Sequence, residues 1–359
     1  MKTAIITFQD GENYGAQLQA YALKHVLSQD SDCDVLNFYN PHFHRKKIQP
    51  GLKGAVVSLL FGRAYQRKHE RFQQFQKDCL LGDAPYLQKE DLPGVNGSYD
   101  LFVTGSDQVW NLRCSGGQTA YFLDFVEDPN KKFSYAASFG GVEFPEPQRV
   151  KELLSSFRGI SIREESGQKT IAELLGRQVP VVLDPTLLMT GDQWKESFGL
   201  EFGEEYVLAY EVICGDHLID IAQRYAEEKG MKLICITNSN QFRPGVKCVR
   251  DAGPREWLQL FAGSACVFTN SFHGLAFSLN FRKQFYLELL PPPASTNARM
   301  EELLNKLELS DRILKNGQWS RKIIDYSFAA EKIAAMREDS LSYVSEMLSQ
   351  AEPSESAKI

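Results

Sequence analysis

The feature that most constrains the fold is an apolar run that changes its period at a polar corner, within residues 265–281, ACVFTNSFHGLAFSLNF. Residues 265–269 are apolar and favour a short buried strand, whereas Leu275, Ala276 and Leu279 continue at helical spacing. Asn270 or Ser271 can cap the helix, because a side-chain oxygen there accepts a hydrogen bond from a backbone N–H. The stretch therefore predicts a strand, a polar corner and a helix in direct succession.

This corner is a candidate ligand site. Ligands of open α/β sheets bind beyond the carboxyl ends of the strands, and a helix N-terminus offers N–H donors to an anion. The predicted first turn holds His273, with Asn270, Ser271 and Gly274 beside it. The alternative is a buried histidine that bonds a backbone carbonyl and has only a structural role.

The same alternation of strand, corner and helix recurs along the chain and restarts after Gly191. A chain of 359 residues also exceeds the length at which single cores stop growing, roughly 250 to 300 residues. We therefore predict an α/β protein with two domains of alternating strands and helices. The expected segments are an N-terminal domain at 1–190, a C-terminal domain at 191–320, a helix at 321–350 that packs back on the first domain, and a disordered tail at 351–359.

Polar side chains follow the first predicted strand, in the loop QDGENYG. Asn13, Tyr14 and Gln17 place amide and phenol groups there, which suits recognition of hydroxyl or phosphate groups. The loop lacks the GxGxxG pattern of dinucleotide sites. The alternative is that Asn13 and Gly15 only shape the turn.

A second polar corner, GSDQVWN, follows the predicted strand at 99–104. A sugar pocket needs an aromatic ring for the apolar face of the sugar and amides or carboxylates for its hydroxyls. The corner provides these groups in Ser106, Asp107, Gln108, Trp110 and Asn111.

A third corner carries Arg163, which follows the strand-like residues 159–162. A guanidinium group can hold a phosphate or carboxylate through two parallel N–H bonds. The alternative is an ion pair with the neighbouring Glu164 or Glu165.

Composition excludes several classes of protein. The net charge of −6 argues against a general nucleic-acid-binding protein, and no apolar run approaches the ~20 residues of a membrane span. The sequence begins without a leader-like segment, and its seven cysteines form no CxxC pair, so we expect a cytoplasmic protein with buried, reduced cysteines and no metal site. Residues 44–71 are basic and amphipathic, which suits either peripheral contact with the inner face of the membrane or a solvated helical hairpin.

Taken together, six blocks of the sequence resemble the polysaccharide pyruvyl transferases: NYGAQLQAYAL, GSDQVWN, SYAASFG, SIREESG, VLDPTLL and TNSFHGLAFS. The resemblance implies two Rossmann-like domains that face a cleft, as in GT-B glycosyltransferases. It also implies transfer of pyruvate from phosphoenolpyruvate to two hydroxyls of a sugar, as a cyclic ketal, with release of phosphate. The acceptor would be a polysaccharide or a lipid-linked precursor of the cell envelope, such as an exopolysaccharide or capsule.

The resemblance implies that His273 and Arg163 are functional and that the GSDQVWN corner lies near the acceptor. Many members carry an arginine two residues before the motif histidine, where this chain has Ser271, and Arg299 is our candidate for its substitute. The expected donor-binding set is Arg163, Asn270, Ser271, His273, Gly274 and Arg299. The expected acceptor-binding set is Asn13, Tyr14, Gln17, Ser106, Asp107, Gln108, Trp110 and Asn111.

The expected chemistry requires a proton donor for the methylene carbon and a base for each attacking hydroxyl, and His273 suits both tasks because histidine titrates near neutrality. Phosphoenolpyruvate is then a co-substrate, and neither a cofactor nor a metal is expected. Two other functions stay open: a GT-B-like glycosyltransferase that uses a nucleotide sugar, and a glycan-binding module without catalysis.

Overall fold

The computed structural model describes residues 1–44, 52–141, 146–213, 217–237, 239, 243–291 and 297–351, with side chains from residue 57 onward in the helix that begins at residue 52. The chain divides into two compact units. Unit 1 draws on Met1–Arg45, Gln76–Leu188 and Ala334–Ile359, and unit 2 on Lys46–Phe75 and Met189–Ile333. The predicted tail at 351–359 lies outside the described residues except for Ala351, which ends the last helix.

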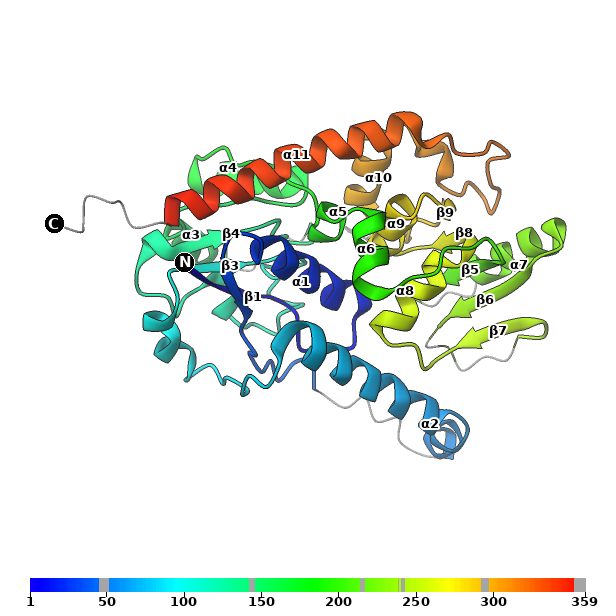
Figure 1. Cartoon of the computed structure of the whole chain (residues 1–359), viewed down its shortest axis with the longest axis horizontal. Coiled ribbons are helices and arrows are strands. Elements are labelled where there is room, and N and C mark those ends of the chain that lie inside the picture. Colours follow the sequence, from blue (N-terminus) through cyan, green and yellow to red (C-terminus); the bar gives the residue numbers. More distant parts are fainter. Residues whose placement is uncertain are drawn as a thin grey trace. The chain divides into compact units, whose positions relative to one another are not determined.

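Unit 1 contains a parallel four-stranded sheet in the order β2-β1-β3-β4. Figure 1 labels three of these strands, β1, β3 and β4. The two central strands of the sheet, β1 and β3, are almost entirely buried, as expected for a parallel sheet that is covered on both faces. Single bridges from Asp107 to Ala137, Ala137 to Ile162 and Ile162 to Val181 continue the pairing beyond β4. The elements are β1 (Lys2–Ile6), α1 (Tyr14–Leu27), β2 (Asp32–Val35), β3 (Leu101–Thr104), β4 (Lys132–Ser134), α3 (Pro147–Ser155), α4 (Glu165–Leu175) and α5 (Pro185–Leu188).

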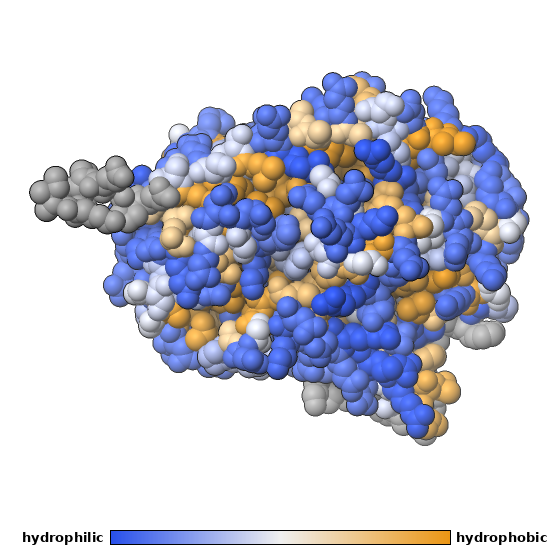
Figure 2. All heavy atoms as spheres, in the orientation of Figure 1, coloured by the Kyte–Doolittle hydropathy of each residue, from blue (hydrophilic) through white to orange (hydrophobic). Residues whose placement is uncertain are grey.

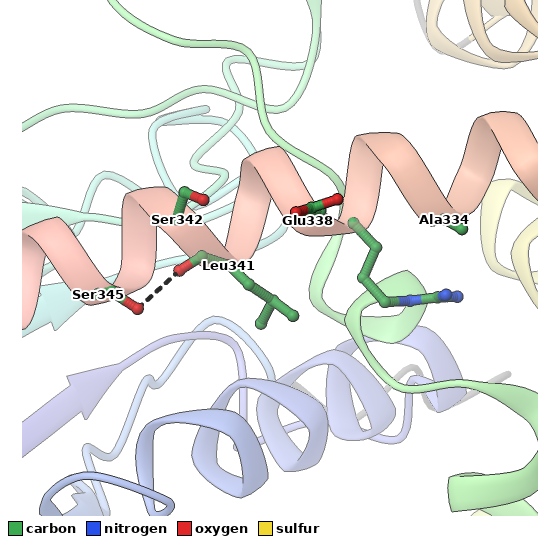
Figure 3. Close-up of a pocket in the computed structure, with 6 residues that line it drawn as sticks. Ala334, Glu338, Leu341, Ser342 and Ser345 are labelled. Carbon is green, nitrogen blue, oxygen red and sulfur yellow. Dashed lines mark hydrogen bonds between the residues drawn. The ribbon is translucent and has the colours of Figure 1, made fainter.

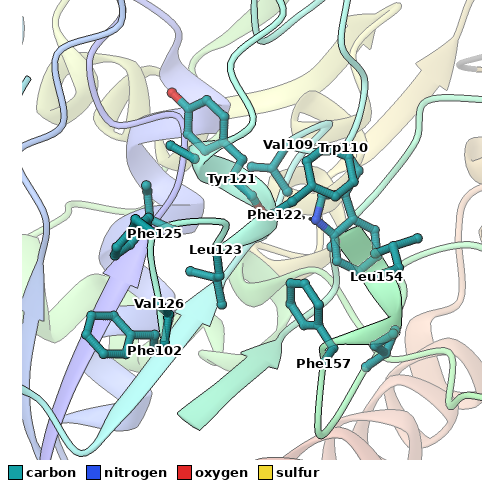
Figure 4. Packing of buried hydrophobic residues seen from close by; sticks show 14 of the residues in the cluster. Phe102, Val109, Trp110, Tyr121, Phe122, Leu123, Phe125, Val126, Leu154 and Phe157 are labelled. Atoms are coloured by element: carbon teal, nitrogen blue, oxygen red, sulfur yellow. Dashed lines mark hydrogen bonds between the residues drawn. The ribbon is translucent and has the colours of Figure 1, made fainter. Parts of the chain in front are cut away.

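The core of unit 1 is rich in aromatic residues, as Figure 4 shows. Trp110 stacks on Phe122 at 5.8 Å between ring centroids and meets Phe157 edge to face at 5.6 Å. Phe102 meets Phe125 in the same way at 5.7 Å. Burial of these large rings supplies much of the hydrophobic stabilisation of this unit.

Unit 2 contains a parallel five-stranded sheet in the order β7-β6-β5-β8-β9. The register pairs Tyr210 of β5 with Thr269 of β8, and Thr269 with Leu287 of β9, so the carboxyl ends of these strands share one edge. The elements are α2 (Leu52–Phe75), α6 (Gly191–Phe198), β5 (Tyr206–Tyr210), α7 (His217–Lys229), β6 (Lys232–Ile236), β7 (Val246–Val249), α8 (Pro254–Ala262), β8 (Ser264–Thr269), α9 (Phe272–Asn280), β9 (Gln284–Leu287) and α10 (Asn297–Lys306). Both sheets fit the predicted α/β class with two Rossmann-like units.

The division of the chain differs from the predicted one at α2. This helix belongs to unit 2, whereas the prediction placed it in the N-terminal domain at 1–190. Arg71 of α2 lies 3.5 Å from the Asp251 carboxylate and 3.2 Å from that of Glu256, and Arg67 lies 3.0 Å from Asp251. These pairs join α2 to the start of α8. Their partners lie far along the sequence, which explains why local patterns do not reveal them.

The last helix, α11 (Tyr326–Ala351), contributes its residues from Ala334 onward to unit 1. There Arg337 donates to the Leu187 carbonyl at 2.8 Å, and the Tyr343 hydroxyl donates to the Ser134 carbonyl at 3.1 Å. The Ser340 hydroxyl accepts from the Leu183 N–H at 3.0 Å. These bonds fix the second half of α11 on β4, on α5 and on the loop before α5.

The described part of α2 carries exposed apolar residues. Leu59 is 86% exposed and Leu60 is 67% exposed, and Figure 2 shows apolar residues on the surface over this helix. No helix among the described residues is long and apolar enough to cross a membrane. The basic residues 45–47 of the predicted amphipathic segment lie outside the described residues.

Candidate functional site

The corner between β8 and α9 forms as the sequence predicts. Ser271 is the N-cap of α9, and its hydroxyl accepts from the Gly274 N–H at 3.2 Å. The Thr269 hydroxyl accepts from the Ser271 N–H at 3.1 Å. Of the two predicted caps, Ser271 is therefore the one that the structure uses, and its side chain is committed to starting the helix.

Gly274 allows α9 to approach β8 closely. A Cβ atom at this position would lie 2.4 Å from the Thr269 hydroxyl oxygen, closer than real Cβ contacts come. Any larger residue would push the first turn of α9 away from the strand. Gly274 therefore has a packing role, and its predicted contact with the donor stays a prediction.

Asn270 joins two neighbouring strands at their carboxyl ends. Its side-chain carbonyl accepts from the Val212 N–H at 2.8 Å, and its amide nitrogen donates to the Ile213 carbonyl at 3.0 Å. Both ends of the amide are engaged and the residue is 4% exposed. Asn270 therefore stabilises the loop after β5, and its predicted contact with the donor stays a prediction.

His273 lies in the first turn of α9, at the predicted corner. It is 8% exposed, and its ring meets that of Phe272 edge to face at 5.4 Å. Arg299, near the start of α10, places its guanidinium carbon 4.7 Å from the centre of the Phe272 ring. The candidate substitute arginine is therefore adjacent to the residue that precedes His273.

Glu211 is a candidate that the sequence analysis does not include. It directly follows β5, where Tyr210 pairs with Thr269, so it reaches the sheet edge beside Asn270. Glu211 is 3% exposed, which is unusual for a carboxylate. The sequence does contain a signal for this residue, because Glu211 is an acidic residue directly after an apolar, strand-like run.

In unit 1, Arg163 lies among three carboxyl groups. Its guanidinium nitrogens lie 2.8 Å from Asp184, 3.6 Å from Asp107 and 3.7 Å from Glu164, and its side chain is 2% exposed. Burial opposes the charge of Arg163, but the three carboxylates outweigh burial and raise the pKa of Arg163. Arg163 therefore forms ion pairs, as the alternative interpretation expected, and its nearest partner is Asp184. A phosphate bound to Arg163 would compete with these carboxylates.

Asp184 is itself held by hydrogen bonds. Its Oδ1 accepts from the Thr186 N–H at 3.0 Å and from the Thr186 hydroxyl at 2.7 Å. The Ser106 hydroxyl lies 3.3 Å from Oδ2 of Asp184 and 2.8 Å from the Ala136 carbonyl. The structure thus brings Ser106, Asp107 and Arg163 into one network, as their positions at adjacent corners suggest.

The prediction that Trp110 is a platform for a sugar is wrong. Trp110 is fully buried in the core of unit 1, and its indole N–H donates to the Tyr121 carbonyl at 3.1 Å (Figure 4). Its polar neighbours in sequence suggested a surface position. Trp110 instead packs among Phe122, Phe139 and Phe157 of the core.

Two other expected acceptor contacts are also wrong, because Ser106 and Gln17 are fully buried. The Gln17 amide donates to the carbonyls of Gln9 and Gly11 at 2.6 and 2.9 Å, which fixes the loop after β1. Asn13 caps α1 by accepting from the Ala16 N–H at 3.2 Å, so it does shape the turn.

The remaining acceptor candidates differ in how far they reach the surface. The amide of Asn111 donates to Gln108 at 3.0 Å and Asn111 is 7% exposed, while Tyr14 is 6% exposed. Asn13 is exposed and Gln108 half-buried. Among the predicted acceptor residues, these two therefore offer the most accessible polar groups.

A surface pocket lies along α11 in unit 1, and none of the predicted site residues lines it (Figure 3). Within the described ranges, no group of three or more His, Cys, Asp or Glu side chains is arranged to hold a metal ion. The pocket is lined by Ala334, Arg337, Glu338, Leu341, Ser342 and Ser345.

Comparison with known proteins identifies one family. The family model described as polysaccharide pyruvyl transferase matches residues 13–287, which include the corners of both units. A search of the curated proteins found no match.

Similar solved structures share little sequence with this chain. A Staphylococcus aureus MnaA structure with UDP is 11% identical, with a TM-score of 0.49 and coverage of 95% of this chain and 91% of that one. UDP-GlcNAc 2-epimerase from Neisseria meningitidis, bound to UDP-GlcNAc, is 11% identical, with a TM-score of 0.49 and coverage of 98% and 94%. The glycosyltransferase SnogD from Streptomyces nogalater is 12% identical, with a TM-score of 0.44 and coverage of 98% and 100%.

Proposed function

Because the chain belongs to the polysaccharide pyruvyl transferase family, we propose that it transfers pyruvate from phosphoenolpyruvate to two hydroxyls of a sugar. The product is a cyclic ketal on a polysaccharide or a lipid-linked glycan precursor, and phosphate is released. The observation that carries this proposal is the family match over residues 13–287, which spans the corners that hold Arg163 and His273.

The proposed donor site is the start of α9 in unit 2. A helix N-terminus favours an anion, and phosphoenolpyruvate brings both a phosphate and a carboxylate. Arg299 supplies positive charge next to this turn, since its guanidinium packs over Phe272. Many family members carry an arginine at the position of Ser271, and serine has no charge to hold an anion. In this chain Arg299 makes the contact with the donor instead.

The proposed chemistry uses His273 for proton transfer. Protonation of the methylene carbon of phosphoenolpyruvate gives an oxocarbenium-like centre at the neighbouring carbon, and a sugar hydroxyl adds there as it loses its proton. Departure of phosphate regenerates the electrophilic centre for the second hydroxyl. One hydroxyl proton thus replaces the proton used to form the methyl group, and the other leaves with phosphate.

Replacing Arg299 with alanine is expected to weaken phosphoenolpyruvate binding about ten- to a hundredfold, because a charge-assisted hydrogen bond contributes roughly 1.5–3 kcal/mol. Isothermal titration calorimetry of the full chain measures this. Arg321→Ala is a matched control, since Arg321 also packs over an aromatic ring in unit 2, that of Trp319. Equal affinities of the Arg299 variant and the wild type would rule out Arg299 as the substitute arginine.

The reaction class is tested by supplying the protein with phosphoenolpyruvate or with nucleotide sugars, each with a panel of nitrophenyl and lipid-linked sugars. We expect phosphate release that depends on both phosphoenolpyruvate and a sugar. Release of nucleotide from a nucleotide sugar would indicate a glycosyltransferase, and glycan binding without turnover of either donor would indicate a binding module.

We also propose that α2 contacts an anionic membrane surface, which would bring the protein to a lipid-linked acceptor. The proposal is supported by the exposed Leu59 and Leu60 and by Arg63 and Arg67 on the following turns of the same helix. Replacing both leucines with serine should reduce sedimentation with phosphatidylglycerol vesicles severalfold. Phe328→Ser, at an exposed apolar residue of α11, should not. Equal sedimentation of all three proteins would exclude this contact.

A further inference from the structure

A cluster outside the predicted site joins the loops that follow β1 and β2 in unit 1. Asp10 comes from the loop after β1, and Tyr39 and His44 come from the segment after β2. These strands pair in parallel, so their carboxyl ends lie at one edge of the sheet. That edge is where open α/β sheets bind ligands.

A buried carboxyl group orients an accessible histidine in this cluster. Oδ2 of Asp10 lies 2.7 Å from Nε2 of His44 and accepts from the Asn40 N–H at 3.1 Å. The Asp10 side chain is 5% exposed, whereas that of His44 is 38% exposed. Burial raises the pKa of Asp10 although the bonds from His44 and Asn40 oppose this. The Asp10 carboxyl group therefore fixes the imidazole of His44, which stays accessible to solvent.

Two tyrosines complete the cluster. The His44 ring stacks on Tyr39 at 4.6 Å between centroids with 14° between the planes. Tyr86 meets Tyr39 edge to face at 5.9 Å and is 54% exposed. Accessible rings beside hydrogen-bonding groups are what a sugar requires, because its C–H face packs on a ring while its hydroxyls form hydrogen bonds.

Hydrogen bonds tie this region to the GSDQVWN corner. The Thr7 hydroxyl donates to the Ser106 carbonyl at 3.1 Å, and the Gln19 side-chain carbonyl accepts from the Ser106 N–H at 2.9 Å. The Gln19 amide also donates to the Thr7 hydroxyl at 2.7 Å. The loop that carries Asp10 and the corner that carries Asp107 therefore belong to one hydrogen-bonded edge of unit 1.

We propose that Tyr39, His44 and Tyr86, anchored by Asp10, form the subsite that binds the acceptor sugar. This inference rests on the proposed transferase function and supplies the aromatic surface that buried Trp110 cannot provide. The exposed ring of Tyr86 takes the apolar face of the sugar. His44 forms a hydrogen bond with a sugar hydroxyl, and Asp10 acts as a positioning residue that holds the imidazole.

Tyr86→Ala and His44→Gln should each raise the KM for the sugar about tenfold and leave the affinity for phosphoenolpyruvate unchanged, since each variant removes a contact that is made only to the sugar. Nitrophenyl glycosides of glucose, galactose, mannose and N-acetylhexosamines serve as probes. Tyr21 and His25 form a second tyrosine–histidine stack in unit 1, on α1, at 6.0 Å. Tyr21→Ala and His25→Gln are therefore matched controls that should leave both constants unchanged.

Saturation-transfer NMR with the same glycosides, without phosphoenolpyruvate, separates this inference from the proposed function. Sugar binding that is lost in Tyr86→Ala and His44→Gln supports the subsite even if no transfer occurs, and absence of transfer then counts against the proposed function alone. Binding that survives in both variants, or a wild-type protein that binds none of the glycosides, would overturn the subsite. Asp10→Asn should weaken binding less than His44→Gln, and the reverse order would contradict its positioning role.

Discussion

The variant His273→Asn is expected to lose turnover by ~10²–10⁴, the usual effect of removing a general acid or base. Asparagine keeps much of the size and some of the hydrogen bonding of histidine, but it cannot exchange a proton near neutral pH. His273 lies at the start of α9, where a helix N-terminus favours an anion and where we propose that the donor binds. Binding of phosphoenolpyruvate and thermal stability should change little.

This effect is measured by phosphate release per folded molecule, together with the melting temperature. His69→Asn is a suitable control, because His69 is an exposed histidine on α2 of the same unit, away from the corner between β8 and α9. The control should keep full turnover. A His273 variant that melts earlier but retains its turnover would show that His273, at 8% exposure, is a structural residue of the core.

The variant Arg163→Ala is expected to lower the free energy of unfolding by ~3–5 kcal/mol, because removing one partner of a buried ion pair leaves the other charge uncompensated. The Asp184 side chain is fully buried at 2.8 Å from the guanidinium. Combining Arg163→Met with Asp184→Asn should recover part of the loss, since no buried charge of this pair remains. Arg163→Lys should fall between wild type and alanine, because a point charge does not reproduce the planar pairing.

Urea denaturation measures these differences. Arg149→Ala is the control, because Arg149 forms an exposed pair with Glu146 at 3.6 Å, and such pairs contribute at most about 1 kcal/mol. If Arg163→Ala keeps its stability but binds phosphoenolpyruvate at least tenfold more weakly, Arg163 contacts the donor as the family resemblance implies. The carboxylate network would then be secondary to ligand binding.

Local sequence patterns predicted the elements that depend on neighbouring residues. The change of apolar period within residues 265–281 corresponds to β8 and α9, and Ser271 caps the helix as one of two expected candidates. The repeated alternation of strands and helices gave two parallel α/β sheets. These features depend on spacing and capping, which act over a few residues.

Contacts between distant segments could not be predicted in this way. The nearest partner of Arg163 is Asp184, whereas only Glu164 and Glu165 were visible beside it in the sequence. Asp10 and His44 come together because β1 pairs with β2, and their 34-residue separation hides this. The burial of Trp110 could not be predicted for a related reason, because its packing partners Phe122, Phe139 and Phe157 lie further along the chain.

The central claim, transfer from phosphoenolpyruvate to a sugar, is tested most directly by mass spectrometry of sugars incubated with the protein and carbon-13-labelled phosphoenolpyruvate. The account predicts a sugar that carries the labelled pyruvyl carbons as a ketal, with one phosphate released for each ketal formed. Unconsumed phosphoenolpyruvate alongside a sugar that has gained a glycosyl unit from an added nucleotide sugar would contradict it.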